Sequence, residues 1–154
     1  HRPHGVGLTP EELAALSNHF APGLLSSLRI RAVTGIPNPD FYRDLAQQGI
    51  PAPLDFSRMA GLTLLDSILV VNSRIPRSQW LPLLFNEAVH AVQYHQLGSS
   101  AFIQQYVQGW AQGGMQYERI PLETEAYRLQ RRFEADPRTG FSVTEEVSRF
   151  LASV

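Results

Sequence analysis

The sequence predicts an α+β fold in which a small sheet is followed by a series of helices. Two short apolar runs, at 62–65 and 68–71, are separated by two polar residues and have the length of paired strands. From residue 78 onward, apolar residues recur at helical spacing and glycines mark several helix ends. A chain of 154 residues favours a single core. We therefore expect residues 1–154 to form one domain, with a small mixed or antiparallel sheet packed on a central helix.

The first third of the chain predicts an arm, a helix and a strand. Residues 1–8 are expected to form a flexible arm. The segment 9–12 has a threonine suited to the N-cap, a proline at the first helical position and a glutamate at the third. That helix should run to about residue 19. Residues 28–33 alternate apolar with polar or small side chains, which is typical of a half-buried strand.

The middle of the chain predicts a second helix, a loop and a hairpin. Asn38-Pro39-Asp40 is expected to open the helix, and Gly49 to close it. The segment 50–58 contains two prolines and is expected to be a loop. The apolar runs at 62–65 and 68–71 then form the two strands of a β-hairpin.

Four helices are predicted in the second half of the chain. Glycines follow the first two, and a Ser-x-x-Glu pattern typical of a capping box begins the last. The expected ranges are 78–96, 100–112, 121–135 and 142–154.

The composition limits the kinds of partner and metal site. The net charge is -1 and no basic stripe is present, so we expect no nucleic-acid partner. No apolar run approaches the ~20 residues needed to span a bilayer. The chain contains no cysteine, so any metal must be bound by histidine and carboxylate side chains. The absence of cysteine suits either side of a bacterial membrane, and the compartment is left open.

The central helix carries polar residues within an apolar segment. Asn86, His90 and Gln93 lie on one face of a helix, and Glu87 lies at the edge of this face. Placing these groups in a mostly apolar helix costs stability unless they are paired or bind something. The alternative is a core histidine at position 90, bonded to a neighbour, with Glu87 at the surface. The other histidines, His19 among them, are expected at the surface or folded over the site.

Together, the segments 84–94 and 121–127 resemble small bacterial proteins of the gluzincin type, which are compact zinc metallopeptidase-like domains. The resemblance is carried by Leu-Phe-Asn-Glu-Ala-Val-His-Ala-Val-Gln-Tyr in the first segment and Pro-Leu-Glu-x-Glu-Ala-Tyr in the second. It covers roughly residues 28–135. It implies a zincin-like fold and a hydrolase that acts on peptide bonds, with zinc as its cofactor and a peptide or protein as its substrate.

The resemblance also implies roles for individual residues. The family's motif is His-Glu-x-x-His, in which both histidines bind zinc and the glutamate activates the metal-bound water. By position, His90 is a zinc ligand, Glu87 the general base and Glu123 the third ligand, while Asn86 occupies the place of the first histidine. Either Tyr117 or Tyr127 would donate a hydrogen bond to the oxyanion. Two further residues, Gln93 and Glu125, are candidates for supporting the ligands, with solvent exposure as the alternative for Glu125.

Asn86 leaves two functions open. Its neutral amide oxygen is a weaker donor to zinc than imidazole, so the site is expected to be impaired as it stands. The first hypothesis is a zinc metallopeptidase-like hydrolase that works through Glu87. The second is a metal-free pseudo-peptidase that binds a peptide or protein in the cleft; a helical domain without a cleft function is the third. The first two require that the His90 imidazole and the Glu123 carboxylate meet across two helices.

Overall fold

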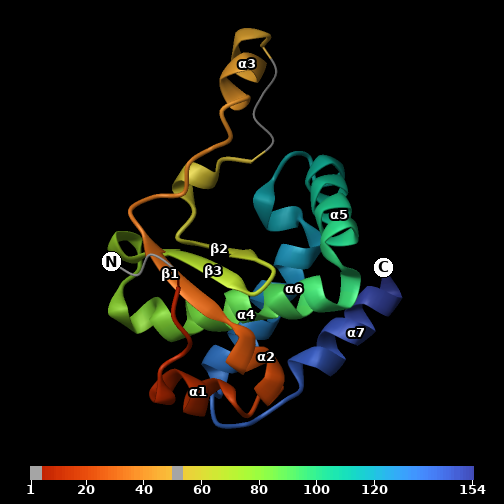
Figure 1. Cartoon of the computed structure of the whole chain (residues 1–154). Coiled ribbons are helices and arrows are strands. Elements are labelled where there is room, and N and C mark those ends of the chain that lie inside the picture. Colours follow the sequence, from red (N-terminus) through yellow and green to blue (C-terminus); the bar gives the residue numbers. More distant parts are fainter. Residues whose placement is uncertain (1–4, 50–53) are drawn as a thin grey trace.

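The computed structural model of the protein describes residues 5–49 and 54–154 and has the predicted α+β composition (Figure 1). A three-stranded mixed sheet has the order β1-β3-β2. The central strand β3 (Ser67–Val71) pairs parallel with β1 (Arg29–Val33) and antiparallel with β2 (Gly61–Leu64). The predicted hairpin is therefore confirmed. Leu65 lies in the tight turn between β2 and β3 and adopts a φ of 59°. No strand among the described residues pairs with the outer edge of β2.

The long central helix α4 (Trp80–Leu97) organises the rest of the molecule. It contacts β2 on one side and α5, α6 and α7 on others. All eleven residues from Leu84 to Tyr94 are buried, because α4 is covered on nearly every side. The α-helix begins two residues later than predicted, since a 3₁₀ turn at Arg77–Gln79 precedes it.

The three helices that follow agree closely with their predicted ranges. They are α5 (Ser99–Gln112), α6 (Pro121–Ala135) and α7 (Val143–Ser153). Pro121 occupies the first turn of α6, as the sequence indicated. Gly109 of α5 allows a close approach to this turn, since a Cβ there would lie 2.6 Å from Cδ of Pro121. This contact sets the distance between α5 and the beginning of α6.

The N-terminal elements of the structure differ from the predicted ones at several points. The first helix, α1 (Pro10–Leu16), has the predicted capping box at Thr9 but ends three residues early. The helix α2 (Pro22–Ser27) was not predicted. Residues 1–4 of the predicted arm lie outside the described residues, and the rest is not free, because Val6 pairs with Ile30 of β1.

The second predicted helix is shorter than expected. It is α3 (Tyr42–Gln47), at the tip of an extension that stands away from the sheet (Figure 1). Asn38 does not cap it; instead, its side chain bonds Asp55 at 3.0 Å and the main-chain N–H of Phe56 at 2.7 Å. These bonds join the two ends of the extension. Part of the predicted loop, 50–53, lies outside the described residues, and Phe56–Arg58 forms a 3₁₀ turn.

His19 lies in the core, so its predicted surface position is wrong. Its side chain is only 2% exposed and packs edge-on against the rings of Phe85, Phe133 and Phe141. Neither ring nitrogen has a hydrogen-bond partner among the described residues. Burial therefore lowers the pKa of His19, because the charged imidazolium would lack solvation.

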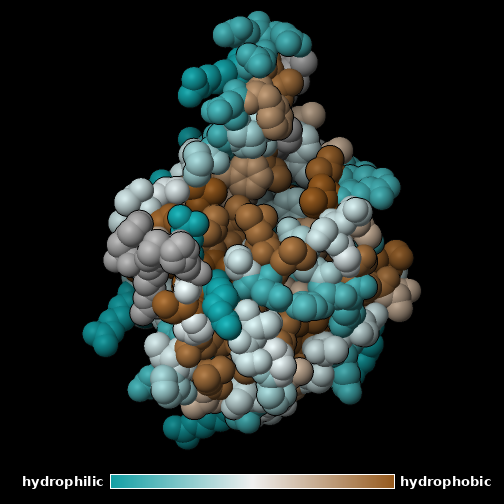
Figure 2. Space-filling model, in the orientation of Figure 1, coloured by the Kyte–Doolittle hydropathy of each residue, from teal (hydrophilic) through white to brown (hydrophobic). Residues whose placement is uncertain are grey.

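None of the helices in the described part of the chain has the length and hydropathy that a membrane span requires. The surface is nevertheless uneven in character. Figure 2 shows hydrophobic side chains gathered around a hollow beneath the α3 extension, on the face that carries β2 and α5. This hollow adjoins the polar residues of α4.

A network of ion pairs joins α6 to α7. Glu146 of α7 bonds Arg128 at 2.9 Å and Arg132 at 3.0 Å, and it also pairs with Arg149. The Glu146 side chain is 16% exposed. The hydrogen bond from Arg128 is the main cause that lowers the pKa of Glu146.

We predict that Glu146→Gln lowers the free energy of unfolding by about 1 kcal/mol at neutral pH, because three guanidinium groups lose their shared carboxylate. The folded-state pKa of Glu146 lies below its unfolded value. The contribution of the ionised Glu146 carboxylate to the free energy of unfolding is therefore present above the unfolded-state pKa. It is lost as the pH falls through the folded-state pKa. Urea denaturation at several pH values should show the difference between the two proteins shrinking below about pH 4.

Glu145→Gln is the matched control, because Glu145 is the exposed neighbour of Glu146 and, among the described residues, its side chain pairs with Arg149 alone, at 3.6 Å. It should change the free energy of unfolding by less than about 0.5 kcal/mol. Equal losses in the two variants would show that Glu146 has no special role.

Candidate functional site

The polar residues of α4 line up at its centre and face β2 and α6. Asn86, Glu87 and His90 are 6%, 5% and 5% exposed, and Gln93 is fully buried. The alternative that places Glu87 at the surface is therefore wrong. The expected face forms because residues three or four apart stack on one side of a helix. Each of the four side chains then finds a partner on another element or on the next turn.

The imidazole of His90 is oriented by two successive hydrogen bonds through Gln93, the second of which is to the main chain. The Gln93 Nε2 donates to the carbonyl oxygen of Leu122 at 3.0 Å, which turns its Oε1 toward His90. That oxygen lies 2.8 Å from His90 Nδ1, so Nδ1 must carry the proton and donate it. Gln93 therefore supports His90, as was predicted, and leaves Nε2 of the imidazole pointing away from it.

The predicted meeting of His90 and Glu123 is confirmed. His90 Nε2 lies 3.3 Å from Glu123 Oε2, and the two side chains are 7% and 3% exposed. Burial alone would lower the pKa of His90, but the Glu123 carboxylate outweighs it and raises that pKa to about 9. Conversely, His90 lowers the pKa of Glu123 against the effect of burial. The two groups form a buried imidazolium–carboxylate pair at neutral pH.

Tyr106 completes the surroundings of Glu123 and was not predicted as a site residue. Its hydroxyl donates to Glu123 Oε1 at 2.6 Å. From the sequence, Tyr106 belongs to an apolar stripe of α5, and only the packing of α5 against α6 brings it to a carboxylate. Burial and the charge of Glu123 raise the pKa values of Tyr106 and Tyr117. Both hydroxyls therefore stay protonated and can act as donors.

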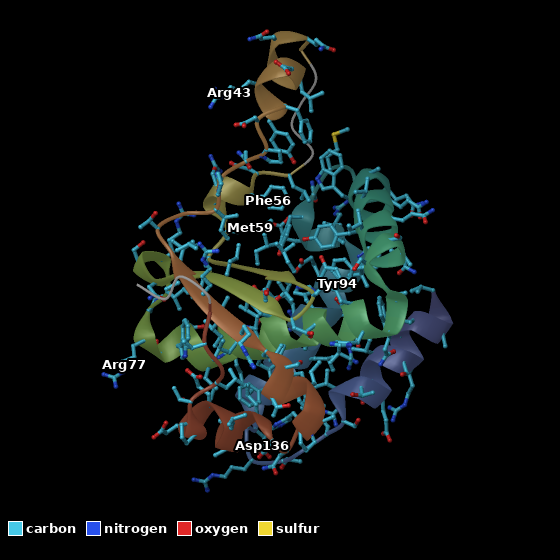
Figure 3. The ribbon with its side chains drawn as sticks, in the orientation of Figure 1. Arg43, Phe56, Met59, Arg77, Tyr94 and Asp136 are labelled. Atoms are coloured by element: carbon cyan, nitrogen blue, oxygen red, sulfur yellow. The ribbon has the colours of Figure 1, made fainter. Side chains whose placement is uncertain are left out.

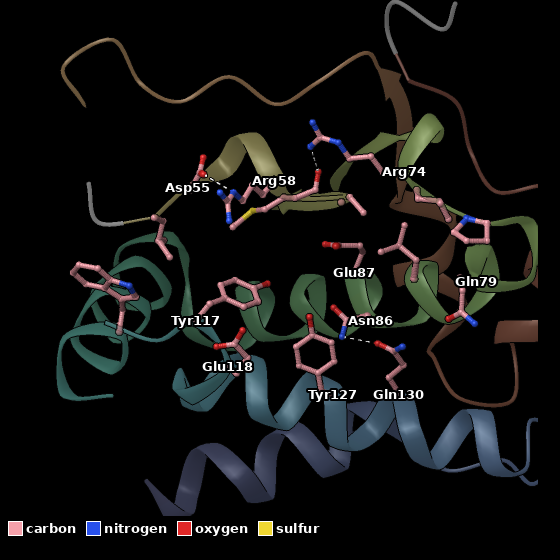
Figure 4. Close-up of a pocket in the computed structure, with 18 of the residues that line it drawn as sticks. Asp55, Arg58, Arg74, Gln79, Asn86, Glu87, Tyr117, Glu118, Tyr127 and Gln130 are labelled. Atoms are coloured by element: carbon pink, nitrogen blue, oxygen red, sulfur yellow. Dashed lines mark hydrogen bonds and ion pairs between the residues drawn. The ribbon is translucent and has the colours of Figure 1, made fainter. Parts of the chain in front are cut away.

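Glu87 stands against the edge strand β2. Thr63 donates to Glu87 Oε2 at 2.6 Å, while Oε1 has no hydrogen-bond partner among the described residues. A Cβ on Gly61 would lie 2.6 Å from Oε1, so glycine is required there for the carboxylate to fit. Burial is the main cause that raises the pKa of Glu87. Figure 4 shows the Glu87 side chain pointing into the cavity below Arg58 and Arg74.

Asn86 is turned toward α6. Its Nδ2 donates to Gln130 Oε1 at 2.9 Å, a contact that the sequence did not indicate. Tyr117 and Tyr127, the two candidates for an oxyanion donor, both line the same cavity (Figure 4). Glu125, by contrast, is buried away from the site and bonds Arg128, so neither predicted role for Glu125 is correct.

The site opens into a cleft made of two adjoining cavities. The larger, of about 830 Å³, contains polar side chains such as Asn86, Glu87 and Gln130. The smaller, of about 300 Å³, is mostly apolar and extends between β2 and α5, with Phe56, Met59 and Tyr94 in its lining (Figure 3). Five residues line both cavities: Leu54, Met59, Gly61, Glu87 and Tyr117. Glu87 therefore lies at the junction of a polar half and an apolar half of one cleft.

The side chains present do not complete a catalytic zinc site. Such a site requires three protein ligands and an open position. His90 and Glu123 supply two, and Asn86 offers a neutral amide whose nitrogen is engaged by Gln130. Throughout residues 5–49 and 54–154, no group of three or more His, Cys, Asp or Glu side chains is arranged to hold a metal ion. The missing ligand corresponds to the first histidine of the motif implied by the resemblance, at the position where this chain has Asn86.

Comparison of the chain with protein-family models, with curated proteins and with solved structures gives no significant match. The function must therefore be argued from the site itself.

We predict that Tyr106→Phe lowers the free energy of unfolding by about 1–3 kcal/mol, because the buried Glu123 Oε1 loses its donor. Urea denaturation at pH 7 measures the loss. Tyr94→Phe is the control, since Tyr94 is also buried but its hydroxyl has no hydrogen-bond partner among the described residues. If the two variants lose the same stability, the bond to Glu123 does not stabilise the site.

Proposed function

We propose that the chain is a zincin-like domain, related to gluzincin-type peptidases, that binds an extended peptide in its cleft without a metal. The observation that carries this proposal is the Asn86 side chain, which bonds Gln130 instead of supplying a histidine ligand, in a cleft bordered by a strand edge that no described strand pairs with. In this arrangement the protonated imidazole is the cation beside Glu123. The position that a third zinc ligand would occupy holds Asn86, which bonds Gln130.

The edge strand β2 offers a way to bind a peptide main chain. It pairs with β3 on one side, no described strand pairs with its other side, and residues 59–64 line the cleft along its length. An extended peptide can add a strand to such an edge through main-chain hydrogen bonds, while pockets select its side chains. The two halves of the cleft are suited to this, because one accepts polar groups and the other apolar ones.

The first test is peptide binding in the presence of a chelator. We expect the protein to select ligands from a library of eight-residue peptides, with affinities that EDTA does not change. Methylating alternate amide nitrogens along one edge of a selected peptide should weaken binding about tenfold or more, because those N–H groups would face β2. Methylating the other alternate set is the control and should be tolerated.

Loss of binding on addition of EDTA would contradict a metal-free mode. Equal tolerance of both methylation patterns would contradict strand addition.

A zinc-dependent hydrolase is the second candidate, and one distance favours it. Two ligand atoms about 2.0–2.1 Å from zinc at a tetrahedral angle lie about 3.3–3.4 Å apart. The observed separation of His90 Nε2 and Glu123 Oε2 is 3.3 Å. Glu87 lies one position after Asn86, where the family has its general base. Restoring histidine at position 86 would supply the missing ligand.

We predict that Asn86→His binds one zinc ion per chain, because it completes a His-His-Glu ligand set. Zinc titration with elemental analysis should show binding at least about 100-fold tighter than in the unchanged protein. The double variant Asn86→His, Glu123→Gln is the control and should lose most of this gain. Zinc binding by neither variant would show that residues 86, 90 and 123 do not form a ligand set.

A further inference from the structure

We infer that the cleft recognises the free amino terminus of a peptide whose first residue has a large apolar side chain. This inference rests on the proposed function and names the ligand that the same cleft would select. Three features carry it: an apolar cavity, a carboxylate oxygen of Glu87 that has no hydrogen-bond partner among the described residues and lies where this cavity meets the polar one, and the position of that carboxylate against Gly61 at the start of β2.

The smaller cavity is suited to a large apolar group. Its outer wall is formed by side chains without charge, and its volume of about 300 Å³ lies at the lower end of the range for small-ligand pockets. Ile103 and Val107 of α5 are 56% and 50% exposed, and Leu64 at the end of β2 is 50% exposed. These three side chains line the smaller cavity. Figure 2 shows a hydrophobic hollow on the face of the molecule that carries β2 and α5. A ligand that covers these side chains removes apolar surface from water.

Among the described residues, the carboxyl and basic side chains that line this cavity are Glu87, His90 and Glu123, and no described lysine or arginine lines it. Glu123 has His90 as its partner, whereas Oε1 of Glu87 has no hydrogen-bond partner in the described part of the chain. The Glu87 residue is 5% exposed, and its side chain points into the cleft (Figure 4). A buried carboxylate is stabilised by a cation that can also donate hydrogen bonds.

The arginines of the polar half already have acceptors. Arg58 pairs with Asp55 at 3.3 Å. Arg74 donates to the main-chain oxygen of Met59 at 3.1 Å and to that of Ser57. His90 acts on both Glu87 and Glu123 but is in contact with Glu123, so its single charge does not balance both carboxylates and a ligand ammonium would neutralise the charge that is left.

The position of Glu87 favours an α-ammonium over a lysine side chain. In an amino-terminal residue, the charge and the side chain are attached to the same carbon atom, so the two groups must be bound side by side. Glu87 lies at the junction of the two cavities, directly beside the apolar one. Gly61 has no Cβ, and the Glu87 carboxylate occupies the space that a Cβ would fill, so this carboxylate lies directly against the start of β2. The remainder of the peptide would then occupy the polar half.

The probes are the tripeptide amides Phe-Ala-Ala, N-acetyl-Phe-Ala-Ala and Gly-Ala-Ala, titrated into the full chain by NMR with EDTA present. We expect the free Phe peptide to bind at least tenfold more tightly than either of the others. Glu87→Gln should remove the preference for the free amine while leaving the binding of the acetylated peptide unchanged. Val107→Asp should remove the preference for phenylalanine over glycine.

Glu134→Gln and Leu13→Asp are the matched controls, because both residues are exposed and lie outside the cleft. Neither should alter the preferences. If library-selected peptides bind but acetylation has no effect, the inference is wrong and the proposed function stands. If no peptide binds in either experiment, both are wrong.

Discussion

The contact between His90 and Glu123 is the interaction on which the site depends. Both groups are almost fully removed from water, so neither could remain charged there without the other. Their contact requires α4 and α6 to pack closely. It also requires Gln93 to orient the imidazole and Tyr106 to satisfy the other carboxylate oxygen. The site is therefore a product of three helices, and loosening any of them would leave a buried charge uncompensated.

Two glycines allow the close contacts that position the carboxylates of the site. Gly109 lets α5 approach the first turn of α6, which carries Glu123. Gly61 lets Glu87 lie against β2. At both positions the missing Cβ permits a close contact between elements, and the contact in turn aligns a carboxylate. The cleft follows from this geometry, because no strand in the described part of the chain pairs with the outer edge of β2, and α5 supplies an apolar wall there.

Much of the fold could be predicted from local patterns. The helices from α4 to α7 and the β2–β3 hairpin follow from hydrophobic periodicity, glycines and N-terminal caps, which act within a few residues. The failures lie where tertiary contacts outweigh local preference. Asn38 does not cap α3, because its side chain forms hydrogen bonds with Asp55 and with the main-chain N–H of Phe56 across the extension. His19 is buried among three aromatic rings that come from distant segments.

The sequence by itself determined that His90 and Glu123 belong to two helices, that Glu87 lies beside His90, and that histidine is missing at position 86. These are properties of spacing along one helix or of residue identity. The tertiary structure alone decided which partners those groups have, because Thr63, Tyr106 and Gln130 come from other elements. It also decided that one carboxylate oxygen of Glu87 has no hydrogen-bond partner among the described residues. The position of Glu87 at the junction of a polar and an apolar cavity depends on the tertiary structure too, since a cavity exists only between packed elements.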